Sequence, residues 1–407
     1  YIIAHLKLSL VLKKWYYELK DNDRNQVYLA NTLEPFESHG LIPFMREISE
    51  ESKTANELKL RKKILVVTAN PPYRGMSANK GQWIQDLLKK GYTCKDGSKD
   101  DGYYQVDGKP LGERNPKWLQ DDYVKFIRFA QWKIDMAGEG IVGFITNHSY
   151  LDNPTFRGMR QSLMNSFNRI HILNLHGSSL RQEKTPDGNK DENVFDIRPG
   201  VAISIFEKNE GSRDKKIFYA NLFGKREEKY AWLDRHTISN TIWQELKPES
   251  PHYFFVPKDE GLLEEYKGFP RLDQIFSHYS LSIQTHRDSF VIDFNKEALT
   301  KRISVFRDLK VSDEVVRQTF SLEDTSSWKM KEARKIASEI RNWQTFMTKI
   351  LYRPFDSRWL FYHEAVVDRI RKEIMKHMDQ PNTALLVSRQ LSMPSFNHVF
   401  VSDTISE

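Results

Sequence analysis

Cysteine is almost absent from this sequence, with Cys94 alone among its 407 residues. A single cysteine excludes a disulfide framework and a zinc site built from cysteines. The 12 histidines show no zinc spacing, and no glycine-rich loop is followed by Lys-Ser or Lys-Thr, which excludes a P-loop ATPase within this sequence. Long apolar runs and a signal-peptide pattern are also lacking. We therefore expect a reduced, cytoplasmic protein without a membrane-spanning segment.

The composition suits a packed protein with a modest basic excess. Hydrophobic residues make up 39% of the chain, which is enough to build cores, and 407 residues exceed one ordinary domain. Two domains are therefore expected. The net charge of +7 suits a polyanionic partner, although ordinary basic proteins reach the same balance.

The most informative stretch is residues 64–75. Its first six residues form a short apolar run that predicts a fully buried strand, which stops at Asn70-Pro71-Pro72-Tyr73 because proline cannot donate to a ladder. A rigid corner at the carboxyl end of such a strand lies where open α/β sheets bind ligands. The Asn70 side-chain oxygen and the Pro71 carbonyl can accept the two hydrogens of an exocyclic amine. Pro72 then fixes the geometry and Tyr73 stacks on the ring. The alternative is a proline-stiffened turn with a surface tyrosine.

These four residues resemble the Asn-Pro-Pro-Tyr signature of N6-adenine DNA methyltransferases. The resemblance extends along most of the chain, and it is closest to the methyltransferase and target-recognition region of type ISP restriction–modification enzymes. It implies S-adenosylmethionine as the cofactor, double-stranded DNA as the partner, and a flipped target adenine. It also implies nuclease and ATP-driven motor domains upstream in the parent chain.

A second motif lies at residues 192–206, where a polar loop and a Pro-Gly turn lead into an apolar strand. In the family, a phenylalanine before such a strand packs against the flipped adenine, opposite the tyrosine. Phe195 matches it by position. Aromatic contacts of about 1–3 kcal/mol each offset much of the cost of extruding a base. Phe195 could instead be an ordinary core residue.

The cofactor half of the family's site is poorly represented. Residues 26–34 predict a short strand ending near Asn31, which matches the position that contacts the cofactor's adenine ring, although Asp is commoner there. Asn31 could equally close a turn. The family's Phe-x-Gly-x-Gly turn and its ribose-binding acid are nowhere in the sequence. We expect an excerpt of a longer polypeptide, with both of these upstream.

The other patterns predict an α/β fold. Helical spacing occurs over residues 1–19 and 117–136, and strands are expected at residues 140–146 and 169–175. This alternation supports a doubly wound, Rossmann-like methyltransferase sheet lacking its N-terminal part, over residues 1–250. A mixed α+β target-recognition domain, cut short at Glu407, is expected over residues 251–407.

The second domain interleaves basic and aromatic residues. Helices are predicted over residues 328–350 and 368–378, the latter with Arg369, Lys372 and Lys376 on one face. Such a row suits a phosphate backbone, whereas Arg287, Arg353 and Arg358 lie in polar or aromatic turns that suit base edges or phosphates. A basic helix face is more often merely solvated.

Taken together, the residues and the resemblance predict a DNA methyltransferase that acts on adenine N6 by direct displacement. Two alternatives remain open. A protein-glutamine methyltransferase would use the same corner on an amide, and a non-catalytic DNA-binding specificity fragment would need no cofactor loop.

Overall fold

The computed structural model describes residues 2–17, 20, 25–28, 30–34, 46–73, 77–113, 115–211, 214–259, 261–388 and 398–407. The chain divides into two compact units, Tyr1–Glu260 and Gly261–Glu407, so the division falls at Glu260 rather than at the expected residue 250. Arg74 and Gly75 of the predicted central stretch lie outside the described residues. None of the described helices is both long enough and apolar enough to cross a lipid bilayer.

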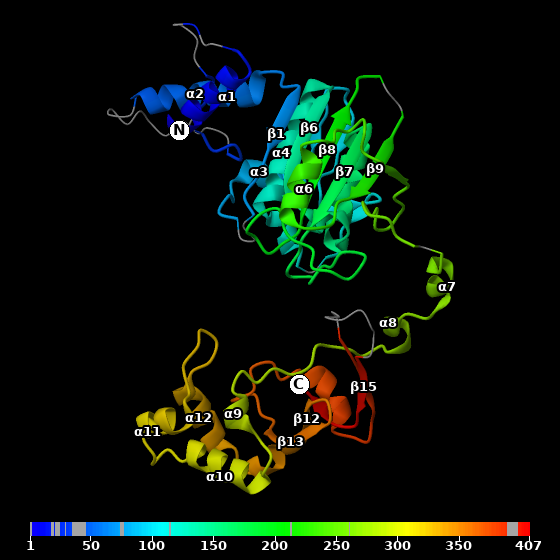
Figure 1. Ribbon diagram of the computed structural model, residues 1–407. Helices are drawn as coiled ribbons and strands as arrows, with labels where there is room; N and C mark the ends of the chain where they lie inside the picture. Colours follow the sequence, from blue (N-terminus) through cyan, green and yellow to red (C-terminus); the bar gives the residue numbers. More distant parts are fainter. Residues whose placement is uncertain are drawn as a thin grey trace. The chain divides into compact units, whose positions relative to one another are not determined.

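The N-terminal unit is built on a mixed sheet (Figure 1). Its described strands follow the order β1-β6-β8-β7-β9-β10. Their bounds are Val66–Ala69 (β1), Gly140–Asn147 (β6), Val201–Lys208 (β8), Arg169–His176 (β7), Lys216–Asn221 (β9) and Gln244–Leu246 (β10). β8 runs antiparallel to both β6 and β7, whereas β1 and β6 are parallel. The α/β class is confirmed, but these strands do not make up a complete Rossmann sheet.

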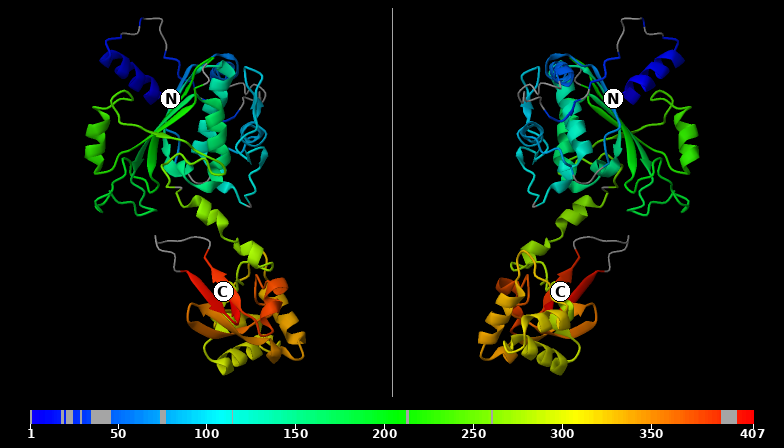
Figure 2. Two further views of the ribbon diagram at one scale, coloured as in Figure 1. Left: turned by 90° about the vertical axis from the view of Figure 1, so that its right-hand side faces the viewer. Right: turned by 90° about the vertical axis from the view of Figure 1, so that its left-hand side faces the viewer.

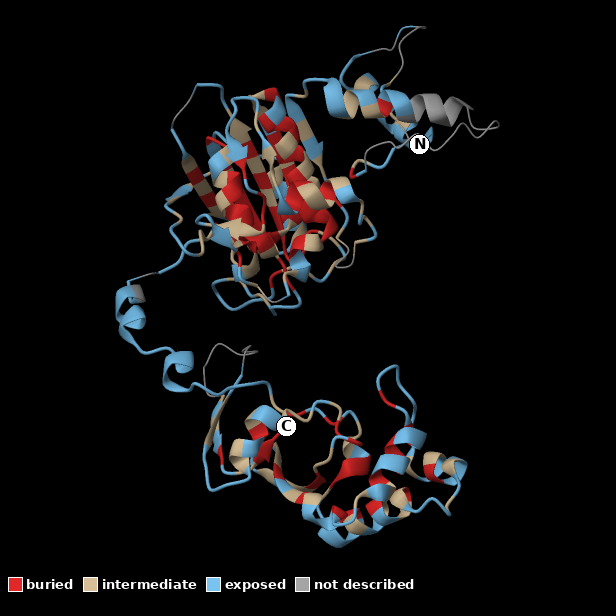
Figure 3. Cartoon of the chain, turned by 180° about the vertical axis from the view of Figure 1, so that it is seen from behind, coloured by how far each residue is buried: buried red, intermediate tan, exposed pale blue. Residues whose placement is uncertain are grey.

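Successive side chains along each strand point to opposite faces of the sheet, and apolar side chains line both faces. Val142 and Phe144 of β6 pack in the core beneath α4 (Asp122–Ala137) and α5 (Arg157–Ser166). Ile145 packs on the other face, with residues of α6 (Arg226–Leu233). Figure 2 shows the sheet between α4 and α6, and Figure 3 shows buried residues concentrated in these layers.

The predicted burial of the central strand is wrong. β1 has an alternating exposed and half-buried pattern, and Val66 is 61% exposed. The reason is its position, because among the described strands β1 pairs with β6 alone. The predicted strand over residues 26–34 is also wrong, since the described residues there form turns and irregular backbone.

Short elements complete the N-terminal unit. Its helices are α1 (Ile2–Lys14), α2 (Arg46–Arg61) and α3 (Gln82–Lys89), with η1 (Lys117–Gln120), η2 (His148–Leu151) and η3 (Pro154–Phe156). Two small hairpins pair β2 (Tyr92–Thr93) with β3 (Lys99–Asp100), and β4 (Gln105–Val106) with β5 (Lys109–Pro110). The predicted helix near the N-terminus and the helix–strand succession over residues 117–175 are confirmed.

The C-terminal unit has its own core. A sheet of order β11-β13-β12-β16 joins Ile292–Asp293, Asp356–Phe361, Met347–Arg353 and Ile405–Ser406. A separate hairpin pairs β14 (Ala384–Val387) with β15 (Val399–Ser402). Its helices are α7 (Leu263–Gly268), α8 (Leu272–Ile275), α9 (Asp288–Val291), α10 (Lys296–Arg307), α11 (Asp313–Phe320), α12 (Met330–Glu339), η4 (Trp343–Phe346), α13 (Lys372–Met375) and η5 (Lys376–Met378).

Two helix predictions fail in this unit. The helix expected over residues 328–350 ends at Glu339, and residues 347–353 instead form β12, whose backbone pairs antiparallel with β13. The helix expected over residues 368–378 is interrupted at Arg371, whose φ of 54° is left-handed, so α13 begins only at Lys372.

Candidate functional site

The predicted corner follows β1 directly and lies at the carboxyl edge of the sheet, where β1 and β6 end. Asn70 is exposed and Pro71 is buried, whereas Pro72 is exposed and Tyr73 half-buried. The Tyr73 hydroxyl donates to the Ile145 carbonyl over 3.3 Å, and burial raises the pKa of this hydroxyl. The corner thus offers the Asn70 amide to solvent, while the tyrosine is anchored to the neighbouring strand.

The structure brings Tyr73 and Phe195 together, although they lie far apart in the sequence. Their ring centroids are 5.9 Å apart and the rings are tilted by 57°. A planar base between two parallel rings needs about 7 Å, or two carbon–carbon contacts of about 3.5 Å. The two rings touch each other in this state, so a base would have to displace one of them to be sandwiched.

Phe195 is carried by the Phe195 loop, defined as residues 177–200, which connects β7 to β8. The Asn193 side chain closes this loop on itself: Nδ2 donates to the carbonyls of Gly177 (3.1 Å) and Pro199 (2.8 Å). Its Oδ1 accepts from the Phe195 backbone N–H at 2.9 Å. One amide therefore joins the two ends of the loop and fixes the backbone of the aromatic residue.

Helix α6 clamps the same segment from the side. The fully buried Lys229 Nζ donates to the carbonyls of Leu175 (2.7 Å) and Glu192 (2.6 Å) and to Asp191 Oδ2 (3.0 Å). Burial lowers the pKa of Lys229, and the Asp191 carboxylate opposes this effect. The Tyr230 hydroxyl donates to the carbonyl of Val194, the neighbour of Phe195.

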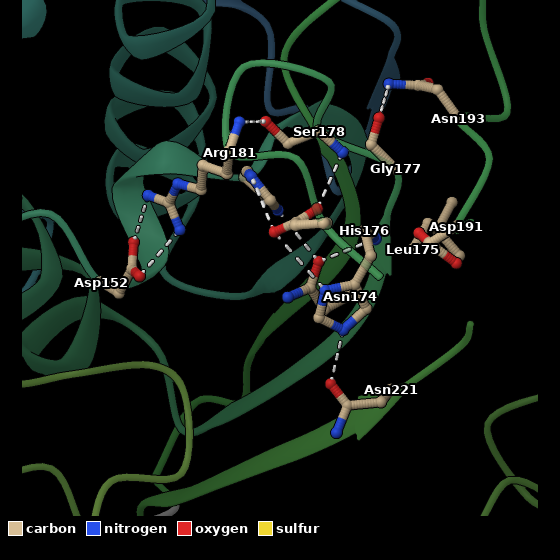
Figure 4. A network of polar contacts seen from close by, with 12 residues as sticks. Asp152, Asn174, Leu175, His176, Gly177, Ser178, Arg181, Asp191, Asn193 and Asn221 are labelled. Carbon is tan, nitrogen blue, oxygen red and sulfur yellow. Dashed lines mark hydrogen bonds and ion pairs between the residues drawn. The ribbon is translucent and has the colours of Figure 1, made fainter. Parts of the chain in front are cut away.

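A polar network beneath the loop was missed by sequence reasoning (Figure 4). His148 follows β6 and His176 ends β7, and both face Glu183 of the loop, at 3.9 Å and 3.8 Å from its Oε1. Burial lowers the pKa of His148. Burial opposes ionisation of Glu183, but the two nearby imidazoles of His176 and His148 and a hydrogen bond from the Ser178 N–H lower its pKa to about 2.

The network also binds the strands together. His148 Nδ1 lies 3.2 Å from Asn174 Oδ1, and His176 Nε2 lies 2.7 Å from Asn221 Oδ1. Arg181 of the loop pairs with both oxygens of Asp152 at 2.9 Å (Figure 4). The polar strand ends of β6 and β7 were the available sequence signal, but their partners come from a distant loop.

Asn31, which was predicted to contact the adenine ring of the cofactor, is exposed and bonds to two neighbouring residues of this chain. Its Oδ1 accepts from the Leu33 N–H at 3.1 Å and its Nδ2 donates to Asn79 Oδ1 at 2.9 Å, so both side-chain polar atoms bond within this chain. This geometry favours the turn-closing alternative. Within the described residues, no three histidine, cysteine, aspartate or glutamate side chains are grouped to hold a metal ion.

The arginines predicted to contact DNA differ in their surroundings. Arg287 lies 3.8 Å from the Trp328 ring centroid and donates to two backbone carbonyls, which indicates a structural role. Arg358 bonds Asp356 through Nε (3.0 Å) and Nη2 (2.7 Å). Arg353 is the more accessible, with 55% of its side chain exposed.

The predicted basic row is not a row on one helix. Arg369 precedes the interruption at Arg371, and Lys372 and Lys376 follow it. Each of the three is exposed and faces a carboxylate, of Asp368, Glu364 and Glu373 respectively. Residues 261–407 hold 22 Lys and Arg against 20 Asp and Glu, so DNA binding by this unit would depend on where charges lie rather than on their excess.

Comparison with known proteins finds a family model that matches most of the C-terminal unit. Residues 274–407 match the model of the Type ISP C-terminal specificity domain. No curated protein sequence matches the chain.

Three solved structures share the fold. The DrdV–DNA complex aligns with 100% of the chain at 22% identity and a TM-score of 0.62. A nuclease-deletion mutant of the Type ISP restriction–modification enzyme LlaGI, in complex with a DNA substrate mimic, covers 91% at 21% identity and 0.58. The ATP-dependent Type ISP enzyme LlaBIII bound to DNA covers 90% at 22% identity and 0.56. The chain spans 40%, 31% and 24% of these proteins, respectively.

Proposed function

We propose that this chain recognises double-stranded DNA as part of a Type ISP restriction–modification enzyme, and that its N-terminal unit methylates adenine at N6. The observation that carries the proposal is the Asn-Pro-Pro-Tyr corner at the carboxyl edge of the sheet. The ring centroids of Tyr73 in this corner and of Phe195 lie 5.9 Å apart. The specificity-domain match in the C-terminal unit supports DNA as the partner. Nuclease and ATP-driven motor domains in the parent chain belong to the same proposal.

In the proposed reaction, the Asn70 side-chain oxygen and the Pro71 carbonyl accept the two hydrogens of the adenine N6 amine. Holding both hydrogens favours a tetrahedral nitrogen, whose lone pair can then attack a methyl carbon. The methyl group would come from S-adenosylmethionine, whose S–CH3 bond would break to leave S-adenosylhomocysteine, and N6 would afterwards release one proton to solvent. No covalent enzyme intermediate is formed.

The target base would have to leave the duplex, which costs a few kcal/mol of stacking. Tyr73 and Phe195 would repay part of this cost, since aromatic stacking is worth about 1–3 kcal/mol per base. Tyr73 is anchored to Ile145, so Phe195 is the ring expected to yield when a base enters.

The test uses the protein as its gene encodes it, expressed in cells that lack adenine methylation. We expect N6-methyladenine in the cellular DNA, and we expect Asn70→Ala to remove it without weakening DNA binding in a gel-shift assay. Asn165→Ala, at an exposed asparagine of α5, is the matched control. An Asn70→Ala variant that keeps a tenth or more of the methylation would exclude the assigned role.

A non-catalytic specificity function is the second candidate, favoured because the matching family model describes a specificity domain. It predicts DNA binding without N6-methyladenine in the same cells. Methylated glutamine in cellular protein, with unmodified DNA, would instead support the protein-glutamine methyltransferase alternative.

A further inference from the structure

The hairpin of β12 and β13 ends in an unusual turn. Arg353 pairs with Asp356 across the hairpin, so Pro354 and Phe355 form its tip. Phe355 is 95% exposed and has a φ of 64°. Its ring centroid lies 6.0 Å from that of Phe400, in an edge-to-face arrangement. A large apolar side chain thus stands in solvent at the end of a hairpin.

Among the described residues, the edge contact with Phe400 leaves the Phe355 side chain almost fully exposed, so packing gives little reason for a phenylalanine here. A left-handed backbone disfavours residues with a Cβ atom, and glycine or asparagine is the usual choice. Exposing an aromatic ring to water has a further cost, because the ring buries little surface in return. Strained residues of this kind are concentrated at ligand clamps and active sites.

The base of the hairpin is braced. The pairing register shifts between Leu351 and Arg353, which leaves Tyr352 as a bulge, and bulges re-aim side chains near functional sites. The Arg358 guanidinium is 4.1 Å from both the Tyr352 and the Phe294 ring centroids. The Tyr352 hydroxyl donates to Asp288 Oδ2 at 3.1 Å. These contacts stiffen the support of the tip.

A positive charge lies beside the apolar tip. The Arg353 guanidinium is 4.0 Å from the Tyr352 ring centroid, its Nη1 lies 3.9 Å from Glu407 Oε2, and more than half of its side chain is exposed. An apolar ring next to a cation matches the DNA duplex, in which the apolar stack lies beside anionic phosphates.

We propose that Phe355 is a wedge that inserts between neighbouring base pairs of duplex DNA, while Arg353 contacts an adjacent phosphate. This inference rests on the proposed function, since it requires the C-terminal unit to bind DNA. Apolar wedges unstack a base step and kink the duplex, which makes a base easier to extrude. Phe355 is thereby a positioning residue for the DNA and not a reader of base edges.

The test compares binding of the full chain to two 30-bp duplexes (about three helical turns). One duplex is intact, and the other has a single abasic position flanked by 2-aminopurine. The abasic gap removes the unstacking cost, so we expect the wild-type chain to bind it about tenfold more tightly and to quench the 2-aminopurine by stacking. Phe355→Ala should bind both duplexes equally and leave the fluorescence unchanged, whereas Phe355→Trp should behave as wild type.

Phe269→Ala is the matched control, since Phe269 is a 63% exposed phenylalanine of the same unit. Phe355→Gly, which suits the left-handed backbone, serves if the alanine variant loses folded structure. Equal preference and equal quenching by the wild-type and Phe355 variants would overturn the wedge while leaving DNA binding intact. Absence of binding to either duplex by the wild-type chain would overturn both the wedge and the proposed function.

Discussion

Lys229→Met tests how far the buried ion pair beneath the Phe195 loop stabilises the N-terminal unit. Lys229 and Asp191 are both fully buried, and the lysine also donates to the carbonyls of Leu175 and Glu192. Methionine fills a similar volume but removes the charge and the donors. The Asp191 carboxylate would lose its bond from Lys229 and keep the hydrogen bond that the Gly224 N–H donates to its Oδ1 at 2.7 Å.

The expected loss follows from the unpaired carboxylate. Removing one partner of a buried ion pair costs about 3–5 kcal/mol, because the remaining charge stays buried without compensation. We therefore expect the free energy of unfolding to fall by about 3–5 kcal/mol. Lys229→Met combined with Asp191→Asn should recover at least about 1 kcal/mol, since the uncompensated charge is gone.

Urea denaturation gives the free energies, and hydrogen exchange separates the transition of the N-terminal unit from that of the C-terminal unit. Lys247→Met, at an exposed lysine of the same unit, is the control and should change stability by no more than about 0.5 kcal/mol. A loss below about 1 kcal/mol for Lys229→Met, or strictly additive effects in the double variant, would refute the argument.

Four further predictions concern other sites. The folded pKa of Glu183 is about 2, below its ordinary 4.5, so it stabilises the fold above pH 4.5. Urea titrations should show wild type losing up to about 3 kcal/mol more than Glu183→Gln as pH falls from 5 to 2. Burial raises the pKa of Asp121 from its ordinary 3.8 to about 7, so the free energy of unfolding falls as pH rises between these two values. Asp121→Asn should exceed wild type by up to about 4 kcal/mol at pH 8 in the same assay. Gly200→Ala should cost about 1–3 kcal/mol by thermal denaturation, because its Cβ meets the His148 ring, and His148→Ala should relieve the loss. Phe355→Gly should raise the free energy of unfolding by about 1 kcal/mol, and a destabilised variant would assign Phe355 a structural role.

Local sequence patterns predicted the parts of the N-terminal unit that depend on local rules. The strand before Asn70 exists because its residues are apolar and β-branched and proline ends it. Its burial could not be predicted, since this depends on which strands lie beside β1. The proximity of Tyr73 and Phe195 was anticipated through a family resemblance. The tilt that closes the gap between their rings was not, because it is set by packing.

The C-terminal unit was predicted less well because single residues override periodicity there. Arg371 takes a left-handed conformation that no spacing rule reveals, and this separates Arg369 from Lys372 and Lys376. The carboxylates that face these cations are close in the sequence, but only the folded chain shows that they pair. Lys229 was not predicted to be a structural residue, because a lysine in a charged segment is expected to be solvated, whereas the structure buries it fully.

The single amide of Asn193 has a practical consequence for labelling. Because it ties Gly177 to Pro199, the residues between those points form a nearly closed ring whose far side can change without moving its anchor. The exposed Asp187 lies on that far side, next to Gly188, where an added Cβ meets nothing within 4 Å. Once the free thiol of Cys94 is removed by Cys94→Ser, an engineered cysteine at position 187 would carry a fluorophore there. Such a label would show whether the far side of the Phe195 loop moves when DNA is added, while leaving the aromatic residue itself untouched.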